Sequence, residues 1–117
     1  MDKTILVAED DPAIAIMLQM MLEGAGYQVK LQGYGHGLQQ MQEPFPNLLL
    51  LDMLLSGMDG REICRSLKSQ DRTRHIPIIF ISAQPGAQKM ASEAGADAFL
   101  AKPFALDDLL GLVARFV

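Results

Sequence analysis

Apolar runs and helical apolar spacing alternate five times along this chain. Apolar runs at residues 4–8, 48–52, 76–81 and 98–101 predict strands, and the alternating residues 27–31 predict another. Helical patterns follow them, starting after Asp11 and then covering residues 38–42, 60–69, 88–94 and 106–113. Strands that alternate with helices are typical of a parallel sheet covered on both faces, with right-handed crossovers. We therefore predict an α/β fold with a doubly wound, five-stranded parallel sheet flanked by five helices.

The first predicted helix has clear start and stop signals. Asp11 is a good N-cap, Pro12 fits the first helical turn, and Gly24 and Gly26 end the helix. Its apolar positions place the methionines, among them Met17, in the core rather than on a ligand-binding surface.

Four of the predicted strands end on polar residues that handle phosphate or metal ions. Glu9 and Asp10 follow the first strand, Asp52 ends the third, Ser82 follows the fourth and Lys102 follows the fifth. The carboxyl ends of parallel strands meet at one edge of a sheet, where ligands of such folds bind. The sequence thus predicts one polar site at this edge.

Three carboxylates at one site repel one another unless a cation lies between them. A ligand set made only of oxygen atoms favours Mg²⁺ over zinc, and Asp11 is already explained as a helix cap. A lysine such as Lys102 can contact a phosphoryl oxygen or Asp52, and Ser82 offers a hydroxyl to a second oxygen. An aspartate in this setting can attack phosphorus and hold the resulting acyl phosphate.

Composition restricts the alternatives. The chain has 117 residues, which suits one domain, and a net charge of -4 without a basic patch. We expect no direct contact with nucleic acid and none with a membrane, because the longest apolar run is short and no signal peptide precedes the first strand. The single cysteine, Cys64, favours a cytoplasmic protein and is expected to pack in the core. The glycine-rich residues 33–37 lack the lysine of a phosphate loop and are expected to form a plain connection.

The motifs resemble one family. Glu-Asp-Asp after the first strand, Asp52 followed by Met58-Asp59-Gly60, Ser82-Ala83, and Lys102-Pro103-Phe104 are similar to the receiver domain of two-component response regulators. The resemblance covers essentially residues 1–117 and is of the chemotaxis-regulator type. It implies a flavodoxin-like sheet with strand order 2-1-3-4-5.

The resemblance also implies a role for each site residue. Asp52 would accept a phosphoryl group from a histidine kinase, a phosphotransfer protein or a small phosphodonor. Glu9, Asp10, Asp52 and the backbone carbonyl of Leu54 would bind Mg²⁺. Ser82 and Lys102 would contact the phosphoryl group, Phe99 would change rotamer with Ser82, and the Lys102-Pro103 peptide would be cis.

Such a domain is a phosphoacceptor switch, not an enzyme acting on other substrates. Phosphorylation would change the face formed by the fourth helix, fifth strand and fifth helix, which would control an output domain or a downstream protein. One alternative is a phosphohydrolase with an aspartyl phosphate, although Leu54 stands where such enzymes commonly need a second carboxylate. Another is an interaction module that keeps the fold without the chemistry, although the intact acids, Ser82 and Lys102 argue against it.

Several positions depart from the family pattern. Ser56 replaces a usual proline, so the loop after Asp52 is expected to be less restrained. Leu54 and Gln84 flank the path of an attacking water, and an aliphatic Leu54 is expected to slow loss of the phosphate. The segment 84–94 is about two residues short, which predicts a short or mobile fourth helix and argues against a standard dimer through that face, so the oligomeric state is open. Ala105 is a poor N-cap, and the apolar end of the chain fits either a stand-alone receiver or part of a longer protein.

Overall fold

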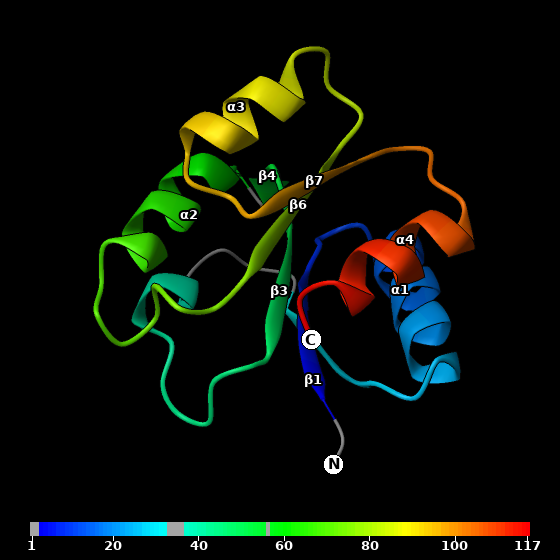
Figure 1. Cartoon of the computed structure of the whole chain (residues 1–117). Coiled ribbons are helices and arrows are strands. Elements are labelled where there is room, and N and C mark those ends of the chain that lie inside the picture. The colour runs from blue at the N-terminus through cyan, green and yellow to red at the C-terminus, as the bar shows by residue number, and fades with distance from the viewer. Residues whose placement is uncertain (1–2, 33–36, 56) are drawn as a thin grey trace.

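The computed structural model describes residues 3–32, 37–55 and 57–117, so Ser56 and most of the glycine-rich segment lie outside the described residues. Five parallel strands form the central sheet in the order β2-β1-β3-β6-β7, which is the predicted order (Figure 1). Their bounds are Thr4–Ala8 (β1), Gln28–Gln32 (β2), Leu48–Asp52 (β3), Ile78–Ser82 (β6) and Ala98–Ala101 (β7). The α/β prediction is therefore confirmed.

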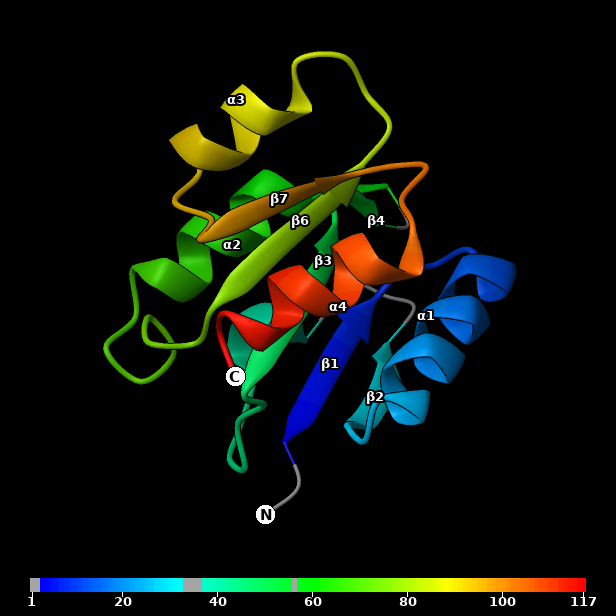
Figure 2. The ribbon, with the colours of Figure 1, turned by 45° about the vertical axis from the view of Figure 1, so that its right-hand side comes forward.

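Helices cover both faces of the sheet. Figures 1 and 2 show α1 and α4 on one face and α2 and α3 on the other. Their bounds are Pro12–Gly24 (α1), Gly60–Lys68 (α2), Ala87–Glu93 (α3) and Leu106–Ala114 (α4). The predicted short fourth helix corresponds to the seven-residue α3. No helix within the described ranges has the length and hydropathy needed to cross a bilayer.

Two local features differ from the predicted elements. The second predicted helix is only a 3-10 turn, η1, at Leu38–Gln40, because Pro44 and Pro46 follow closely and the segment is too short to propagate an α-helix. The loop after β3 forms a small antiparallel pair from β4 (Leu54–Leu55) and β5 (Met58–Asp59). Strands of two residues leave no periodic signal in a sequence.

The core consists of one apolar cluster on each face of the sheet. Residues Leu48 to Leu51 of β3 are fully buried, and they alternate between the two clusters. Cys64 packs in the cluster beneath α2 and α3 as predicted, and burial raises the pKa of its thiol to about 11. The central strand is thus anchored on both faces, which fixes the position of Asp52 at its end.

The helix α1 begins as predicted but exposes more apolar surface than expected. The Asp11 carboxylate accepts hydrogen bonds from the amides of Ala13 at 2.9 Å and Ile14 at 3.4 Å. The expectation that its methionines fill the core was wrong for Met17 and Met20, whose exposed fractions are 39 % and 69 %. Met17 lines a cavity with Ile14 and Phe104, and Met20 lines another with Leu106.

The layer of α2 and α3 is connected to its surroundings by hydrogen bonds and ion pairs. The ammonium of Lys68 donates to the Asp97 carboxylate at 2.8 Å and to the backbone carbonyl of Ile76 at 2.8 Å. Asp59 caps α2 by accepting from the Arg61 amide at 2.9 Å, and the Arg61 guanidinium lowers the pKa of the Asp59 carboxyl. These links connect α2 to the strands and loops around it.

Candidate functional site

The polar ends of four strands converge as the sequence predicted. β1 leads to Glu9 and Asp10, β3 ends at Asp52, β6 ends at Ser82, and Lys102 follows β7. All five residues lie at the carboxyl edge of the sheet. The strand order reverses between β1 and β3, and the site lies around this point. The sheet register therefore builds the site from residues far apart in sequence.

Three carboxylates form a cluster that suits a divalent cation. Glu9, Asp10 and Asp52 each offer one oxygen atom, and these oxygens lie within 4.8 Å of one another. Glu9 is buried, Asp52 is half-buried and Asp10 is exposed. A set of oxygen donors with one solvent-facing member fits Mg²⁺, which keeps several of its waters.

Burial of Glu9 changes its proton affinity. Loss of solvation, followed by a hydrogen bond with the neighbouring Asp52, raises the pKa of Glu9 to about 7, although Lys102 and the Asp11 amide act in the opposite direction. A proton on Glu9 relieves the repulsion between two adjacent carboxylates. A bound cation would relieve the same repulsion without a proton.

Lys102 lies between Glu9 and Asp52. Its ammonium donates to Glu9 Oε1 at 2.9 Å and lies 3.6 Å from Asp52 Oδ2. Burial disfavours the ammonium charge, but the hydrogen bond to Glu9 and the charge of Asp52 outweigh burial, so the pKa of Lys102 is raised. Lys102 is therefore a fixed positive charge beside Asp52. The Lys102-Pro103 peptide is cis, as the resemblance implied.

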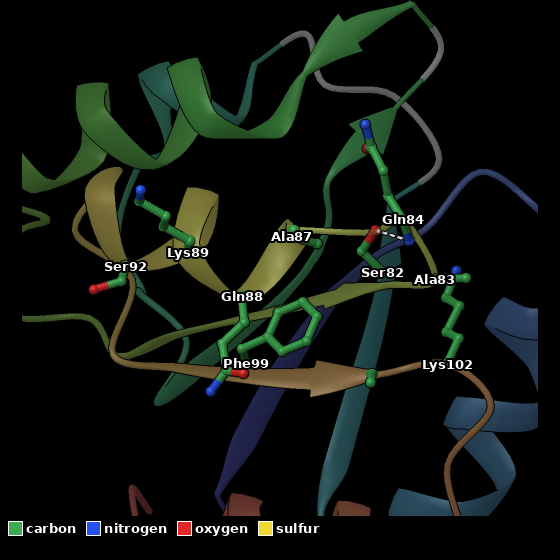
Figure 3. Close-up of a pocket in the computed structure, with 11 residues that line it drawn as sticks. Ser82, Ala83, Gln84, Ala87, Gln88, Lys89, Ser92, Phe99 and Lys102 are labelled. Atoms are coloured by element: carbon green, nitrogen blue, oxygen red, sulfur yellow. Dashed lines mark hydrogen bonds between the residues drawn. The ribbon is translucent and has the colours of Figure 1, made fainter.

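Ser82 and its loop form the next part of the site. The Ser82 hydroxyl oxygen accepts a hydrogen bond from the Gln84 amide at 3.0 Å, which leaves the hydroxyl proton free to be donated elsewhere. Ser82, Lys102 and Phe99 line a cavity of about 660 Å³ between α3 and β7. Figure 3 shows the Phe99 ring in this cavity on the same side of β7 as Ser82.

The loop after Asp52 also contacts the acceptor carboxylate. The Leu54 amide donates to Asp52 Oδ1 at 3.3 Å, and the Leu54 side chain is 65 % exposed. The start of α2 lies against the same backbone, since a Cβ on Gly60 would stand 2.6 Å from the Asp52 carbonyl oxygen. A hydrogen bond of 2.6 Å from the Gly60 amide to the Met53 carbonyl fixes this approach.

Sequence reasoning missed three features of the site. Lys102 is closer to Glu9 than to Asp52, the Gln84 amide holds the Ser82 hydroxyl, and Gly60 packs on the Asp52 backbone. The glycine after Met58-Asp59 was a usable signal, because a glycine at a helix start often marks a close backbone approach. The other two depend on side-chain and amide positions that no local pattern encodes.

Comparison with known proteins supports the resemblance. The sequence profile of the response regulator receiver domain matches residues 5–114. The chain is 34 % identical to the phosphate regulon transcriptional regulatory protein PhoB of Escherichia coli, with 97 % of this chain and 51 % of PhoB covered. It is 35 % identical to the DNA-binding response regulator MtrA of Mycolicibacterium smegmatis, with 97 % and 50 % covered. The chain spans about half the length of these curated relatives.

Solved structures give the same result. A putative response regulator from Chloroflexus aurantiacus has a TM-score of 0.93 at 36 % identity, with 99 % of this chain and 98 % of that chain covered. The receiver domain of the sensor histidine kinase PA1611 from Pseudomonas aeruginosa has a TM-score of 0.89 at 29 % identity, covering 99 % and 98 %. That receiver domain holds a magnesium ion in its active-site cleft.

Proposed function

This chain belongs to the response regulator receiver domain family, and on that premise we propose that residues 1–117 form a Mg²⁺-dependent switch in which Asp52 accepts a phosphoryl group. The observation that supports this most directly is the setting of the Asp52 carboxylate. One oxygen accepts from the Leu54 amide at 3.3 Å, and the other lies 3.6 Å from the Lys102 ammonium. Glu9 also accepts from a backbone amide and from Lys102 within the metal-ligand cluster, but Glu9 is buried, whereas Asp52 is half-buried and open to a phosphodonor.

The transfer is a substitution at phosphorus. An Asp52 oxygen forms the new bond to phosphorus while the bond between phosphorus and the donor group breaks, and the donor leaves with the electron pair and takes a proton from solvent. Lys102 is placed to pair with the negative charge of the transferred group, and Ser82 can donate its free hydroxyl proton to a second oxygen. Mg²⁺, held by Glu9, Asp10, Asp52 and the Leu54 carbonyl, would neutralise part of the remaining charge.

The structural response would pass through Ser82. A phosphoryl group adds about -1.5 to -2 charges and new acceptor oxygens, which would draw the Ser82 hydroxyl and the Lys102 ammonium toward it. Phe99 lines the same cavity as Ser82 and has space there to change rotamer. The face formed by α3, β7 and α4 is therefore the proposed output surface.

The partners follow from the same role. A histidine kinase, a phosphotransfer protein or a small phosphodonor would supply the phosphoryl group, and an output domain or a separate protein would receive the signal. PhoB and MtrA are named as transcriptional and DNA-binding regulators. DNA control through an attached domain is thus one form that the output could take, whereas the described residues supply the switch. A cytoplasmic location stays a prediction.

A phosphorylation assay tests the proposal. The protein is incubated with Mg²⁺ and acetyl phosphate, and the expected result is a mass gain of one phosphoryl group that disappears in Asp52→Asn. Asp107→Asn is the matched control, because Asp107 is an exposed aspartate on α4 away from the site. Phosphorylation that survives Asp52→Asn, or that is equally fast with excess chelator, would contradict the proposal.

The lifetime of the phosphate tests the loop residues. Leu54 and Gln84 line a cavity of about 250 Å³ with Met53, Gly57, Asp59 and Arg61. An aliphatic side chain in this cavity cannot hydrogen-bond an attacking water. We expect Leu54→Asn to shorten the half-life of the phosphorylated protein, measured by mass spectrometry after removal of the donor. Equal half-lives would show that Leu54 does not control hydrolysis.

A further inference from the structure

Arg61 lies where a cation does not stabilise its own helix. It is the second residue of α2, in the first turn. A positive charge is unfavourable there, because the N-terminus of a helix carries a partial positive charge. The side chain instead binds the cap residue, Asp59. Arg61 Nε lies 3.0 Å from each carboxylate oxygen, and Nη2 donates to Oδ2 at 2.6 Å. Helix stability therefore does not explain an arginine at this position.

Asp59 belongs to the loop that contacts the phosphoacceptor. It lies in β5, and the residue paired with it in β4 is Leu54. The Leu54 amide donates to Asp52 Oδ1 at 3.3 Å, and the Leu54 carbonyl is one of the proposed Mg²⁺ ligands. Arg61 is thus connected to the acceptor through two residues, because it binds Asp59 and Asp59 is paired with Leu54.

This loop has few restraints within its own sequence. Residues 53–59 contain no proline, which would limit the backbone, and Gly57 has a φ of 82°. A pair of two-residue strands is only marginally stable by itself. Contacts from outside the loop must then hold the Leu54 backbone. The bidentate contact of Arg61 with Asp59 is one of them.

The guanidinium of Arg61 also contacts α3. Its Nη1 lies 3.2 Å from the sulfur of Met90, which is a weak hydrogen-bond acceptor. α2 and α3 lie on the same face of the sheet (Figure 1). The planar guanidinium is therefore held by Asp59 on one side and by α3 on another. Its donors point in fixed directions, so a guanidinium held in this way also fixes the carboxylate that it binds.

We propose that Arg61 is a positioning residue for the Mg²⁺ and phosphoacceptor site. It acts through Asp59 and the Leu54 backbone, since the hydrogen bonds described for its side chain go to Asp59 and Met90. The inference rests on the proposed function, in which the Leu54 carbonyl binds Mg²⁺. Loss of Arg61 would let the Leu54 backbone move away from Asp52. The result would be weaker binding of Mg²⁺ rather than slower chemistry once the ion is bound.

Hydrogen exchange measured by NMR in metal-free protein tests the positioning directly. Arg61→Gln should speed exchange of the Leu54 amide by about threefold or more, because the loop would open more often. The Leu50 amide, in the centre of the sheet, should change by less than about twofold. An unchanged rate at Leu54 would overturn the proposal. Equal acceleration at both amides would also overturn it, because that result indicates a general loss of stability.

Mg²⁺ titration calorimetry and phosphorylation by acetyl phosphate test how Arg61 acts. Arg61→Gln should weaken Mg²⁺ binding by about three- to tenfold, since residues that orient metal ligands contribute to affinity without touching the ion. The phosphorylation rate in saturating Mg²⁺ should stay within about twofold of the unmodified chain. A residue that contacts the phosphoryl group would lower that rate even when the ion is bound. Such a loss, or an unchanged Mg²⁺ affinity, would contradict a positioning role.

Two further variants separate the bidentate contact from the charge. Arg65→Gln is the matched control, because Arg65 is exposed on the same helix and acts on Asp59 through its charge alone. It should bind Mg²⁺ within about twofold of the unmodified chain. Arg61→Lys keeps the charge but loses the planar bidentate geometry, so its Mg²⁺ affinity should fall between those of Arg61→Gln and the unmodified chain. Equal losses in Arg61→Gln and Arg65→Gln would show that charge, and not the contact with Asp59, is responsible.

Failure of the proposed function would give a different result. An unmodified chain that neither binds Mg²⁺ nor gains a phosphoryl group at Asp52 would contradict the proposed function, and the role of Arg61 with it. Normal Mg²⁺ binding and phosphorylation in the unmodified chain, together with normal Mg²⁺ binding in Arg61→Gln, would contradict the role of Arg61 alone.

Discussion

The two helical layers of this molecule differ in how much apolar surface they expose. The layer of α2 and α3 has no exposed large apolar side chain among the described residues, and an ion pair between Lys68 and Asp97 ties α2 to the segment before β7. The layer of α1 and α4 buries an apolar side, yet Ile16 and Met20 point outward. The layer of α2 and α3 therefore exposes little apolar surface to water, whereas the layer of α1 and α4 has apolar surface available for a contact.

The largest expected difference in unfolding free energy is between a buried apolar residue of one layer and an exposed apolar residue of the other. Leu67→Ala in α2 should lower the free energy of unfolding by about 2 to 5 kcal/mol, because Leu67 is fully buried and its removal leaves a cavity. Met20→Ala in α1 should change it by less than about 0.5 kcal/mol in dilute protein. Urea denaturation measures both. A similar loss for the two variants would show that α1 is buried more tightly than its exposure indicates.

The ion pair of the α2 and α3 layer is the next test. Lys68→Ala removes hydrogen bonds to Asp97 and to the Ile76 carbonyl from a half-buried side chain, and should cost about 1.5 to 3 kcal/mol. Arg74→Ala removes only the exposed pair with Asp71 and should cost less than about 0.5 kcal/mol. If chemical denaturation shows that both variants lose the same free energy of unfolding, the Lys68 contacts do not stabilise this layer.

The carboxyl edge of the sheet lies between the two layers. The pH dependence of stability tests the contacts of the acids at this edge. Glu9 precedes α1 and Asp52 precedes α2, and the pKa of Glu9 is raised from its ordinary value to about 7. The folded protein therefore holds this proton more tightly than the unfolded chain. The stability that Glu9 contributes is present below about pH 4.5 and is lost as the pH rises through about 7.

Magnesium binding should show the opposite trend. A metal ligand must be deprotonated, so Mg²⁺ affinity should fall by up to about tenfold for each pH unit below 7. Titration calorimetry between pH 5 and 8 measures this, and Glu9→Gln should bind Mg²⁺ weakly with a flatter pH profile. A wild-type affinity that is constant across this range would show that Glu9 does not ligate the ion.

The smallest expected effect concerns helix caps. Asp11 and Asp59 cap α1 and α2, whereas α4 begins at Ala105, which has no side-chain acceptor. Ala105→Ser should raise the free energy of unfolding by about 1 kcal/mol by accepting a hydrogen bond from a first-turn amide. The gain should be limited, because the Asp108 carboxylate already accepts from the Ala105 amide at 3.3 Å. A lower melting temperature would contradict the prediction.

Much of the fold could be predicted from local patterns. Four of the five strands of the main sheet are apolar runs with a polar residue at or after the carboxyl end, and parallel pairing brings those ends together without further information. That is why Asp52 and Lys102 could be placed at one site from sequence. The cap at Asp11 could also be predicted from a local pattern, since both amides that donate to its carboxylate lie within three residues.

The remaining features depend on contacts that local patterns do not contain. Periodicity assigned Met17 to the core because α1 is apolar on both sides, and a pattern without a polar side cannot show which side faces water. The preference of Lys102 for Glu9 over Asp52 arises from a difference in distance of less than 1 Å between two atoms on separate strands. Such choices are made by tertiary packing.

Gly60 gives the site one residue that has no side chain. Its Cα lies so close to the Asp52 and Met53 carbonyls that any larger residue would collide with backbone atoms rather than with a movable side chain. In a saturation mutagenesis screen for signalling, position 60 should therefore tolerate substitution as poorly as Asp52 itself. The cause would be geometric, because every replacement would push the acceptor strand away from the helix that supports it.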